Sequence, residues 1–132
     1  WKVSENPFEQ GDQIVVLPAI QPDIALFHAP FADRNGNIWV GRRRELVTMA
    51  HAARHTLVTV EEIRDINLME DEPLAGGSIP ALYVAAIAEA PNGAWPLGLA
   101  GEYAPDAAHL AHYAKQARST DDFQGYLAEH GA

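Results

Sequence analysis

Short runs of apolar residues predict the strands of this chain. β-branched and aromatic side chains are frequent in these runs, which lie at residues 13–17, 23–28 and 56–60. Apolar side chains at consecutive positions are typical of strands that are covered on both faces, as in a parallel sheet. Asn35-Gly36 is a strong turn signal, and it predicts a hairpin between the second run and a returning strand at residues 38–40.

A spacing of three and four residues between apolar side chains predicts three helices. After Arg42 this spacing places four residues on one face, namely Leu46, Met49, Ala50 and Ala53. Asp106 is a suitable N-cap for a second helix, and a third begins at Thr120. Strands that alternate with helices favour an α/β fold with mostly parallel strand pairs.

The segments between these elements give weaker signals. We expect loops at residues 1–12, 69–78 and 94–104, which contain proline and glycine, and a short helical turn at 61–66. Residues 79–88 are compatible with a strand or a helix, and the prolines that bound them favour a strand. The whole of residues 1–132 is interpreted as a single domain, small for a closed α/β unit.

Composition narrows the functional classes. The 132 residues include 9 Lys or Arg, 18 Asp or Glu and no Cys, which gives a formal net charge of −9. Without cysteine there is no disulfide framework, thiolate zinc site or Cys nucleophile. The acidic balance argues against a nucleic-acid partner, and no apolar run is long enough to span a membrane. We expect a cytoplasmic protein, and the start at Trp1 without Met indicates a piece of a longer chain.

Histidines raise the question of a metal site. His51 and His55 are four residues apart on the first predicted helix, and His109 and His112 are three apart on the second. A helical zinc motif carries Glu beside its first His, where this chain has Ala52. We therefore predict solvated helix faces and no metal site.

Four other short motifs are compatible with chemistry, although a structural explanation is favoured for each. Ser4-Glu5-Asn6 and Glu61-Glu62 offer a carboxylate as nucleophile or acid–base group. The backbone of Gly76-Gly77-Ser78 could approach a phosphate, but no Lys follows it. The run from Arg42 to Arg44 could hold the phosphates of a nucleotide-like cofactor, or it could be a solvated helix start.

His28 is the best-placed polar residue of the chain. It ends an apolar run, and ligands of open α/β sheets bind beyond the carboxyl ends of the strands. Asp33 and Asn37 follow closely, so we predict that His28, Asp33 and Asn37 contact substrate. The alternative is a hydrogen-bonded histidine beside turn-forming Asp and Asn residues.

The same region resembles a known family. Residues 22–29, followed by Ala32-Asp33 and Gly36-Asn37, are similar to a stretch of class I CoA-transferase A (α) subunits, of the glutaconate CoA-transferase type. The likeness continues in order over further stretches, namely residues 6–11, 59–63, 79–84, 89–96 and 106–126. It covers essentially the whole chain, and it identifies the chain as the C-terminal half of such a subunit.

The resemblance implies a three-layer α/β fold and a reaction. CoA would move between carboxylic acids through a glutamyl-CoA thioester, with acyl-CoA and carboxylate as substrates and no permanently bound cofactor. The nucleophilic Glu of the family lies on a B (β) subunit, so we expect no catalytic residue in this chain, a B-subunit partner and a heterotetramer. Trp39, Tyr83 and Trp95 are candidate interface residues, because aromatic side chains are enriched at interfaces.

Two alternatives share the same resemblance. Some relatives in steroid-ring degradation hydrolyse a ring carbon–carbon bond of a CoA thioester. A fragment without the nucleophile could also be a non-catalytic pairing module. The residues of this chain do not separate these alternatives from the transferase.

Overall fold

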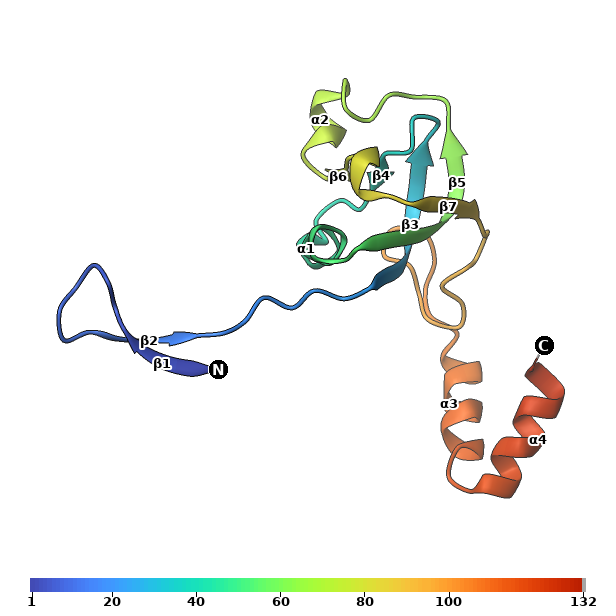
Figure 1. Ribbon diagram of the computed structural model, residues 1–132. Helices are drawn as coiled ribbons and strands as arrows, with labels where there is room; N and C mark the ends of the chain where they lie inside the picture. The colour runs from blue at the N-terminus through green and yellow to red at the C-terminus, as the bar shows by residue number, and fades with distance from the viewer. Residues whose placement is uncertain (132) are drawn as a thin grey trace.

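A five-stranded mixed sheet forms the body of the protein (Figure 1). The structure is a computed structural model that describes residues 1–131. The strand order is β6-β4-β3-β5-β7, and the bounds are β3 Ile24–Asp33, β4 Ile38–Trp39, β5 His55–Arg64, β6 Ser78–Ile79 and β7 Ala86–Glu89. The α/β class predicted from the sequence is confirmed.

The central pair β3 and β5 is long and parallel. Nine residue pairs are in register between Ile24↔His55 and Asp33↔Arg64, and β7 extends the parallel part on the far side of β5. On the other side of β3, β4 and β6 are antiparallel, which makes the sheet mixed. Gly36 adopts φ +90° in the turn between β3 and β4, so the predicted Asn-Gly hairpin is confirmed.

Helix α1 covers one face of the sheet. It spans Arg44–Ala52 and buries Leu46 and Ala50. These side chains join a cluster with residues of β3, β4, β5 and β6 and with Val40, which follows β4; its other members are Ala29, Ala32, Ile38, Val58, Val60 and Ile79. Side chains of one strand alternate between the two faces, so Val58 and Val60 face this core while Thr59 and Glu61 face the opposite side.

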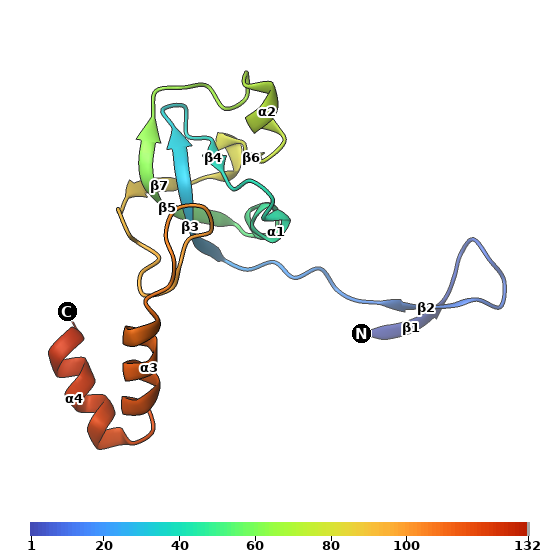
Figure 2. The ribbon, with the colours of Figure 1, turned by 180° about the vertical axis from the view of Figure 1, so that it is seen from behind.

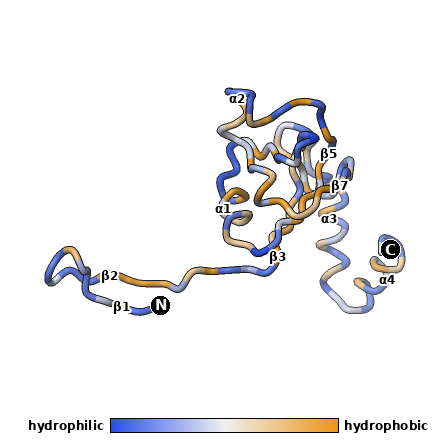
Figure 3. The backbone as a smooth tube through the Cα atoms, turned by 45° about the horizontal axis from the view of Figure 1, so that its top comes forward, coloured by the Kyte–Doolittle hydropathy of each residue, from blue (hydrophilic) through white to orange (hydrophobic). Residues whose placement is uncertain are grey.

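An N-terminal hairpin extends away from the sheet (Figure 2). Strands β1 Lys2–Glu5 and β2 Gln13–Val16 pair only with each other, so the loop predicted at residues 1–12 is partly wrong. The strand predicted at residues 13–17 is present as β2, but its predicted burial is wrong, because Val15 and Leu17 are 59% and 69% exposed. The apolar stretch at β2 and after it is visible in Figure 3. Its composition is typical of a covered strand, but within residues 1–131 its apolar side chains are exposed.

A pair of helices ends the described chain. Helix α3 spans Ala107–Gln116, with the Asp106 side chain accepting a hydrogen bond from His109 N–H, and α4 spans Thr120–His130, with Ser119 in the same role. Both N-caps satisfy backbone donors that the first turn of a helix leaves unpaired. The two helices predicted in this region are therefore confirmed, and they extend from the sheet body as a hairpin (Figure 1).

Three local expectations are corrected. Residues 61–66 are no helical turn, because β5 continues to Arg64 and is held by its parallel neighbour β3. The loop expected at residues 69–78 contains a short helix, α2 Glu72–Ala75, before β6. The strand expected at 79–88 is divided by a 3-10 turn, η1 Ala81–Tyr83, before β7. Among residues 1–131, no helix has both the length and the apolar character needed to cross a membrane.

Candidate functional site

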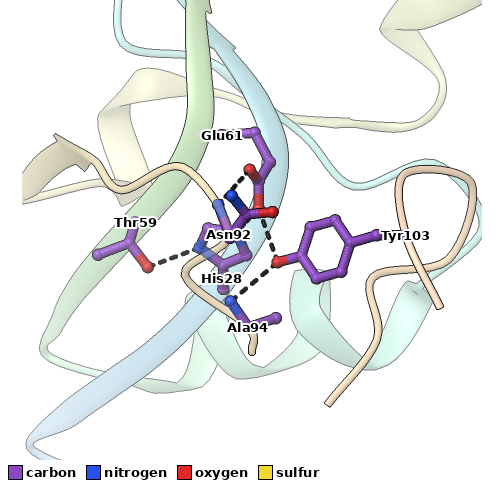
Figure 4. Close-up of polar contacts among 6 residues, drawn as sticks. All are labelled: His28, Thr59, Glu61, Asn92, Ala94 and Tyr103. Atoms are coloured by element: carbon purple, nitrogen blue, oxygen red, sulfur yellow. Dashed lines mark hydrogen bonds and ion pairs between the residues drawn. The ribbon is translucent and has the colours of Figure 1, made fainter. Parts of the chain in front are cut away.

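A polar network joins the parallel strands β3 and β5 (Figure 4). His28 of β3 has Nε2 2.6 Å from Glu61 Oε1 and Nδ1 2.9 Å from Thr59 Oγ1. An ionised carboxylate only accepts hydrogen bonds, so Nε2–H is the donor to Glu61. In the neutral ring Nδ1 then accepts from the Thr59 hydroxyl, which fixes the imidazole at both nitrogens.

The network also holds the segment that follows β7. The Tyr103 hydroxyl donates to Glu61 Oε1 at 2.8 Å, and Asn92 N–H donates to Glu61 Oε2 at 2.7 Å. The Tyr103 hydroxyl in turn accepts from Ala94 N–H at 3.0 Å. Residues 92–103 are thereby tied to the sheet through one carboxylate (Figure 4).

Gly93 permits a close approach between this segment and the imidazole. A Cβ at Gly93 would lie 2.7 Å from the carbonyl oxygen of Ala90 and 2.8 Å from Cε1 of His28. Those separations are shorter than van der Waals contact, so a residue with a side chain would push the segment away from His28. The glycine is therefore part of the geometry of the network.

Glu61 is held in its ionised form. Burial raises the pKa of the Glu61 carboxyl, but hydrogen bonds from Asn92 N–H, His28 and Tyr103 outweigh it and hold the pKa below its ordinary value. Burial and the neighbouring Glu61 charge both raise the pKa of the Tyr103 phenol. At neutral pH the centre is therefore a carboxylate that accepts from a tyrosine O–H and from an imidazole N–H.

A narrow cavity of about 150 Å³ borders the imidazole. His28, Arg43, Leu46 and Leu99 are among its lining residues. The cavity brings a histidine held by a carboxylate beside a guanidinium group, with apolar walls around both. This arrangement can orient an anionic or carbonyl group, and it contains no nucleophilic thiol.

The other two predicted substrate-contacting residues lie in a different environment. Asp33 is 1% exposed and Asn37 6%, and they form a clasp at the end of β3. The Asp33 carboxylate accepts from four N–H groups, those of Asn35 N, Asn37 N, Asn37 Nδ2 and Leu68 N, at 2.7 to 2.9 Å. Asn37 Oδ1 accepts from Ala81 N–H at 2.9 Å. The structure thus brings Asp33 and Asn37 together but leaves His28 apart from them, and substrate contact stays a prediction for all three.

His28 also occupies a different place along its strand. The apolar run suggested that the strand ends at His28, but β3 continues to Asp33. His28 is instead level with the end of the short strand β7, whose Ala88 pairs with Thr59. The site therefore lies where β7 ends and only β3 and β5 continue in parallel.

The two carboxylate motifs singled out in the sequence do not provide a nucleophile or an acid–base pair. Glu61 and Glu62 point to opposite faces of β5, and Glu62 pairs with Arg64 at 2.6 Å, so they form no acid–base pair. Glu5 Oε1 accepts from Gly11 N–H at 3.2 Å within the N-terminal hairpin. These contacts give Glu5 and Glu62 structural partners.

The histidine pairs expected on helices are only partly present. Helix α1 ends at Ala52, so His55 lies in β5 and shares no helix face with His51. His112 of α3 instead faces α4, where its ring lies with Glu129 and His130 such that one ligand atom of each is within 4.8 Å of the others. All three side chains are exposed.

Sequence patterns missed the partners of His28. Thr59 and Glu61 lie in the next parallel strand, and Asn92 and Tyr103 lie in a segment without regular structure. The only signal in the sequence was the alternation along β5, which places Thr59 and Glu61 on one face. Nothing local connects Tyr103 with His28.

Fold and site define an α/β protein with a polar network on a mixed sheet. The chain is 35% identical over 131 residues to the A subunit of glutaconate CoA-transferase from Acidaminococcus fermentans, covering 98% of this chain and 40% of that protein. It is 31% identical over 125 residues to the A subunit of 3-oxoadipate CoA-transferase from Pseudomonas knackmussii, covering 91% and 42%. No protein-family model matches the chain.

The structural comparison agrees. The crystal structure of glutaconate CoA-transferase from Acidaminococcus fermentans matches with a TM-score of 0.84 at 34% identity, over 97% of this chain and 40% of that chain. A further relative is the IpdA subunit of the cholesterol ring-cleaving hydrolase of Rhodococcus jostii, at 29% identity over 90% of this chain and 41% of that protein. The chain spans about two fifths of the length of these relatives.

The chain is thus similar over nearly its whole length to the A subunits of CoA-transferases, and it aligns with the C-terminal part of the glutaconate CoA-transferase subunit. The resemblance found in the sequence is therefore confirmed.

Proposed function

We propose that this chain is part of the A subunit of a CoA-transferase, which moves CoA between carboxylic acids together with a B subunit that supplies the nucleophilic Glu. The observation that carries the proposal is the match to the A subunit of glutaconate CoA-transferase over nearly the whole chain in sequence and in fold. No residue of this chain is assigned as the nucleophile.

The local geometry supports a positioning role for this part of the protein. All polar groups of the His28 network have partners within the protein, so the network fixes the cavity wall rather than offering a reactive group. A transferase of this type needs a rigid wall that holds the acyl group while a carboxylate of the B subunit reacts with the thioester carbon. The CoA thiolate leaves as the mixed anhydride forms, and then attacks the glutamyl carbonyl to release the free acid.

Exposed apolar side chains support a protein partner. Val15, Leu17 and Ile20, in β2 and the segment after it, are 59%, 69% and 84% exposed, and Trp95 is 52% exposed. Apolar surface of this extent on one segment is typical of an interface. Of the other predicted interface residues, Tyr83 is 36% exposed, whereas Trp39 stacks on Phe31. A heterotetramer and a cytoplasmic compartment stay parts of the proposal.

A hydrolase of a ring-containing CoA thioester is the second candidate. The IpdA subunit of a ring-cleaving hydrolase aligns with 90% of this chain at 29% identity. The two candidates differ in the B subunit, where a Glu at the thioester-forming position favours transfer and its loss favours hydrolysis.

Trapping the covalent intermediate tests the proposal. The protein, purified with its B subunit, is incubated with a panel of acyl-CoA thioesters and then with hydroxylamine or borohydride. A transferase forms a glutamyl-CoA thioester on the B subunit, so hydroxylamine inactivates the enzyme only when acyl-CoA is present. The matched control omits the thioester.

The other outcomes are equally informative. Ring opening of a cyclic acyl-CoA without an adduct would replace the transferase by the hydrolase. A stable complex of the two subunits that gives neither adduct nor ring opening with any thioester would refute both activities and leave a pairing module.

A further inference from the structure

A second cavity lies at the arginine run, and it shares Trp39, Gly41 and Arg42 with the cavity that borders His28. It has a volume of about 490 Å³ and is lined by Arg42, Arg44, Trp39 and the backbone at Gly41, Gly76 and Gly77. The arginine run and the Gly76-Gly77 loop are more than thirty residues apart in the chain, and each alone is a weak signal. The fold brings both to one cavity.

Backbone contacts hold the cavity wall in place. The carbonyl oxygen of Gly77 accepts from Val40 N–H at 2.9 Å and from Gly41 N–H at 3.0 Å. A Cβ at Gly77 would lie 3.0 Å from the Cα of Gly41, so the two backbones approach as closely as they do because residue 77 lacks a side chain. The β4–β6 pairing continues this contact, and the wall is therefore a fixed part of the sheet edge.

The arginines of the cavity have no partner among the carboxylates of residues 1–131. Arg34, Arg54 and Arg64 each form an ion pair, with Asp65, Asp23 and Glu62. Within the same described part of the chain, Arg42 and Arg44 form none. Both side chains are exposed and line one cavity, so their guanidinium groups are available there to an anion from outside the chain.

We propose that this cavity binds the phosphate-bearing nucleotide end of a CoA thioester. The inference rests on the proposed function, because that function supplies CoA as the ligand. Guanidinium groups match phosphate oxygens in geometry and charge, and Arg42 and Arg44 line the same space. The volume is in the range of small-molecule sites, and Trp39 adds an apolar surface for the base. The acyl end of the molecule could then extend toward the cavity beside His28, which shares Trp39, Gly41 and Arg42 with this one.

The test compares two thioesters of the same acid. The protein with its B subunit is assayed with an acyl-CoA and with the matching acyl-pantetheine, which lacks the nucleotide. The variants are Arg42→Ala, Arg44→Ala and the double variant. Each charged hydrogen bond is worth about tenfold or more in binding, so the ratio of kcat/KM for acyl-CoA to that for acyl-pantetheine should fall at least about tenfold in the double variant. Higher ionic strength should lower the wild-type ratio and change the variant ratio less.

Arg118→Ala is the matched control. Arg118 lies in the turn between α3 and α4, is exposed, and forms no ion pair within the described residues. Its removal should leave both thioesters unaffected. An equal loss for both thioesters in the Arg42 and Arg44 variants, or no loss for either, would overturn the nucleotide site.

Direct binding separates this inference from the proposed function. If the complex transfers no CoA, calorimetry with 3′-phospho-ADP as the probe still tests the cavity. Binding to the wild type that is lost in the double variant would support the nucleotide site although the transferase proposal failed. No binding of 3′-phospho-ADP to the wild type, or equal binding to both proteins, would refute it.

Discussion

The buried carboxylate of Asp33 gives the sharpest prediction about stability. Asp33→Asn preserves the shape of the side chain but removes its charge and turns one acceptor oxygen into an NH2 donor. Four N–H groups point at the native carboxylate, so the new donor must face at least one of them. Asp33→Ala leaves all four N–H groups without their acceptor.

The magnitude follows from the number of hydrogen bonds. A hydrogen bond to a charged group contributes about 1.5–3 kcal/mol, and a buried donor left unpaired costs about 1–3 kcal/mol. Asp33→Asn should therefore lower the free energy of unfolding by about 2–4 kcal/mol. Asp33→Ala should lower it by about 3–5 kcal/mol, because water entering the space satisfies some of the donors. These are large fractions of the stability of a domain.

The same carboxylate makes stability depend on pH. Burial raises the pKa of Asp33, but hydrogen bonds from the Asn37 side chain and from the backbone N–H groups of Leu68, Asn37 and Asn35 outweigh it and lower the pKa. A carboxyl whose folded pKa lies below its unfolded pKa contributes stability that is complete above the unfolded pKa, about 4. That contribution is lost as the pH falls through the folded pKa, and in Asp33→Asn it should be absent.

Urea unfolding at pH 7 and at lower pH, followed by tryptophan fluorescence, measures both effects. Asp65→Asn is the control, since the Asp65 side chain is 79% exposed and its ion pair with Arg34, at 3.6 Å, is a surface contact. It should change the free energy of unfolding by less than about 0.5 kcal/mol. If Asp33→Asn is as stable as the wild type but binds substrate more weakly, the structural explanation is refuted and the predicted substrate contact is supported.

Three further predictions concern the network, its glycine and metal ions. Glu61→Gln should lower the free energy of unfolding at pH 7 by about 1–3 kcal/mol, because its new amide N–H group faces one of the three groups that donate to the native carboxylate. Urea titrations measure this change, and an unchanged midpoint would contradict the prediction. Gly93→Ala should be destabilised by about 1–3 kcal/mol, because its Cβ would clash with His28 and the backbone. The control Gly125→Ala, with nothing within 4 Å of its Cβ, should be as stable as the wild type or more stable in thermal melts. An unchanged melting temperature for Gly93→Ala would refute the close approach. Dialysis against EDTA should leave activity unchanged, because the sequence predicts no metal site. A loss of activity that zinc restores in the wild type but not in His112→Ala would instead assign a metal to the exposed cluster of His112, Glu129 and His130.

Local sequence signals predicted much of the fold. The Asn35-Gly36 turn, the N-cap Asp106 and the apolar spacing of α1 each depend on backbone preferences or on a period within one element, so each could be recognised without the rest of the molecule. The same local rules failed at residues 61–66, where pairing with β3 extends β5 beyond its apolar run. They failed again at β2, whose apolar side chains have no cover within residues 1–131.

The sequence by itself determined the fold class, the resemblance to CoA-transferase A subunits and the candidate status of His28, because an ordered set of motifs along the whole chain carries that information. Only the tertiary structure decided which polar groups meet. It separated His28 from Asp33, joined His28 to Glu61 and Tyr103, and placed the arginine run against the Gly76-Gly77 loop. The physical reason is that parallel strands and irregular segments bring together residues far apart in the chain, and no local preference records such contacts.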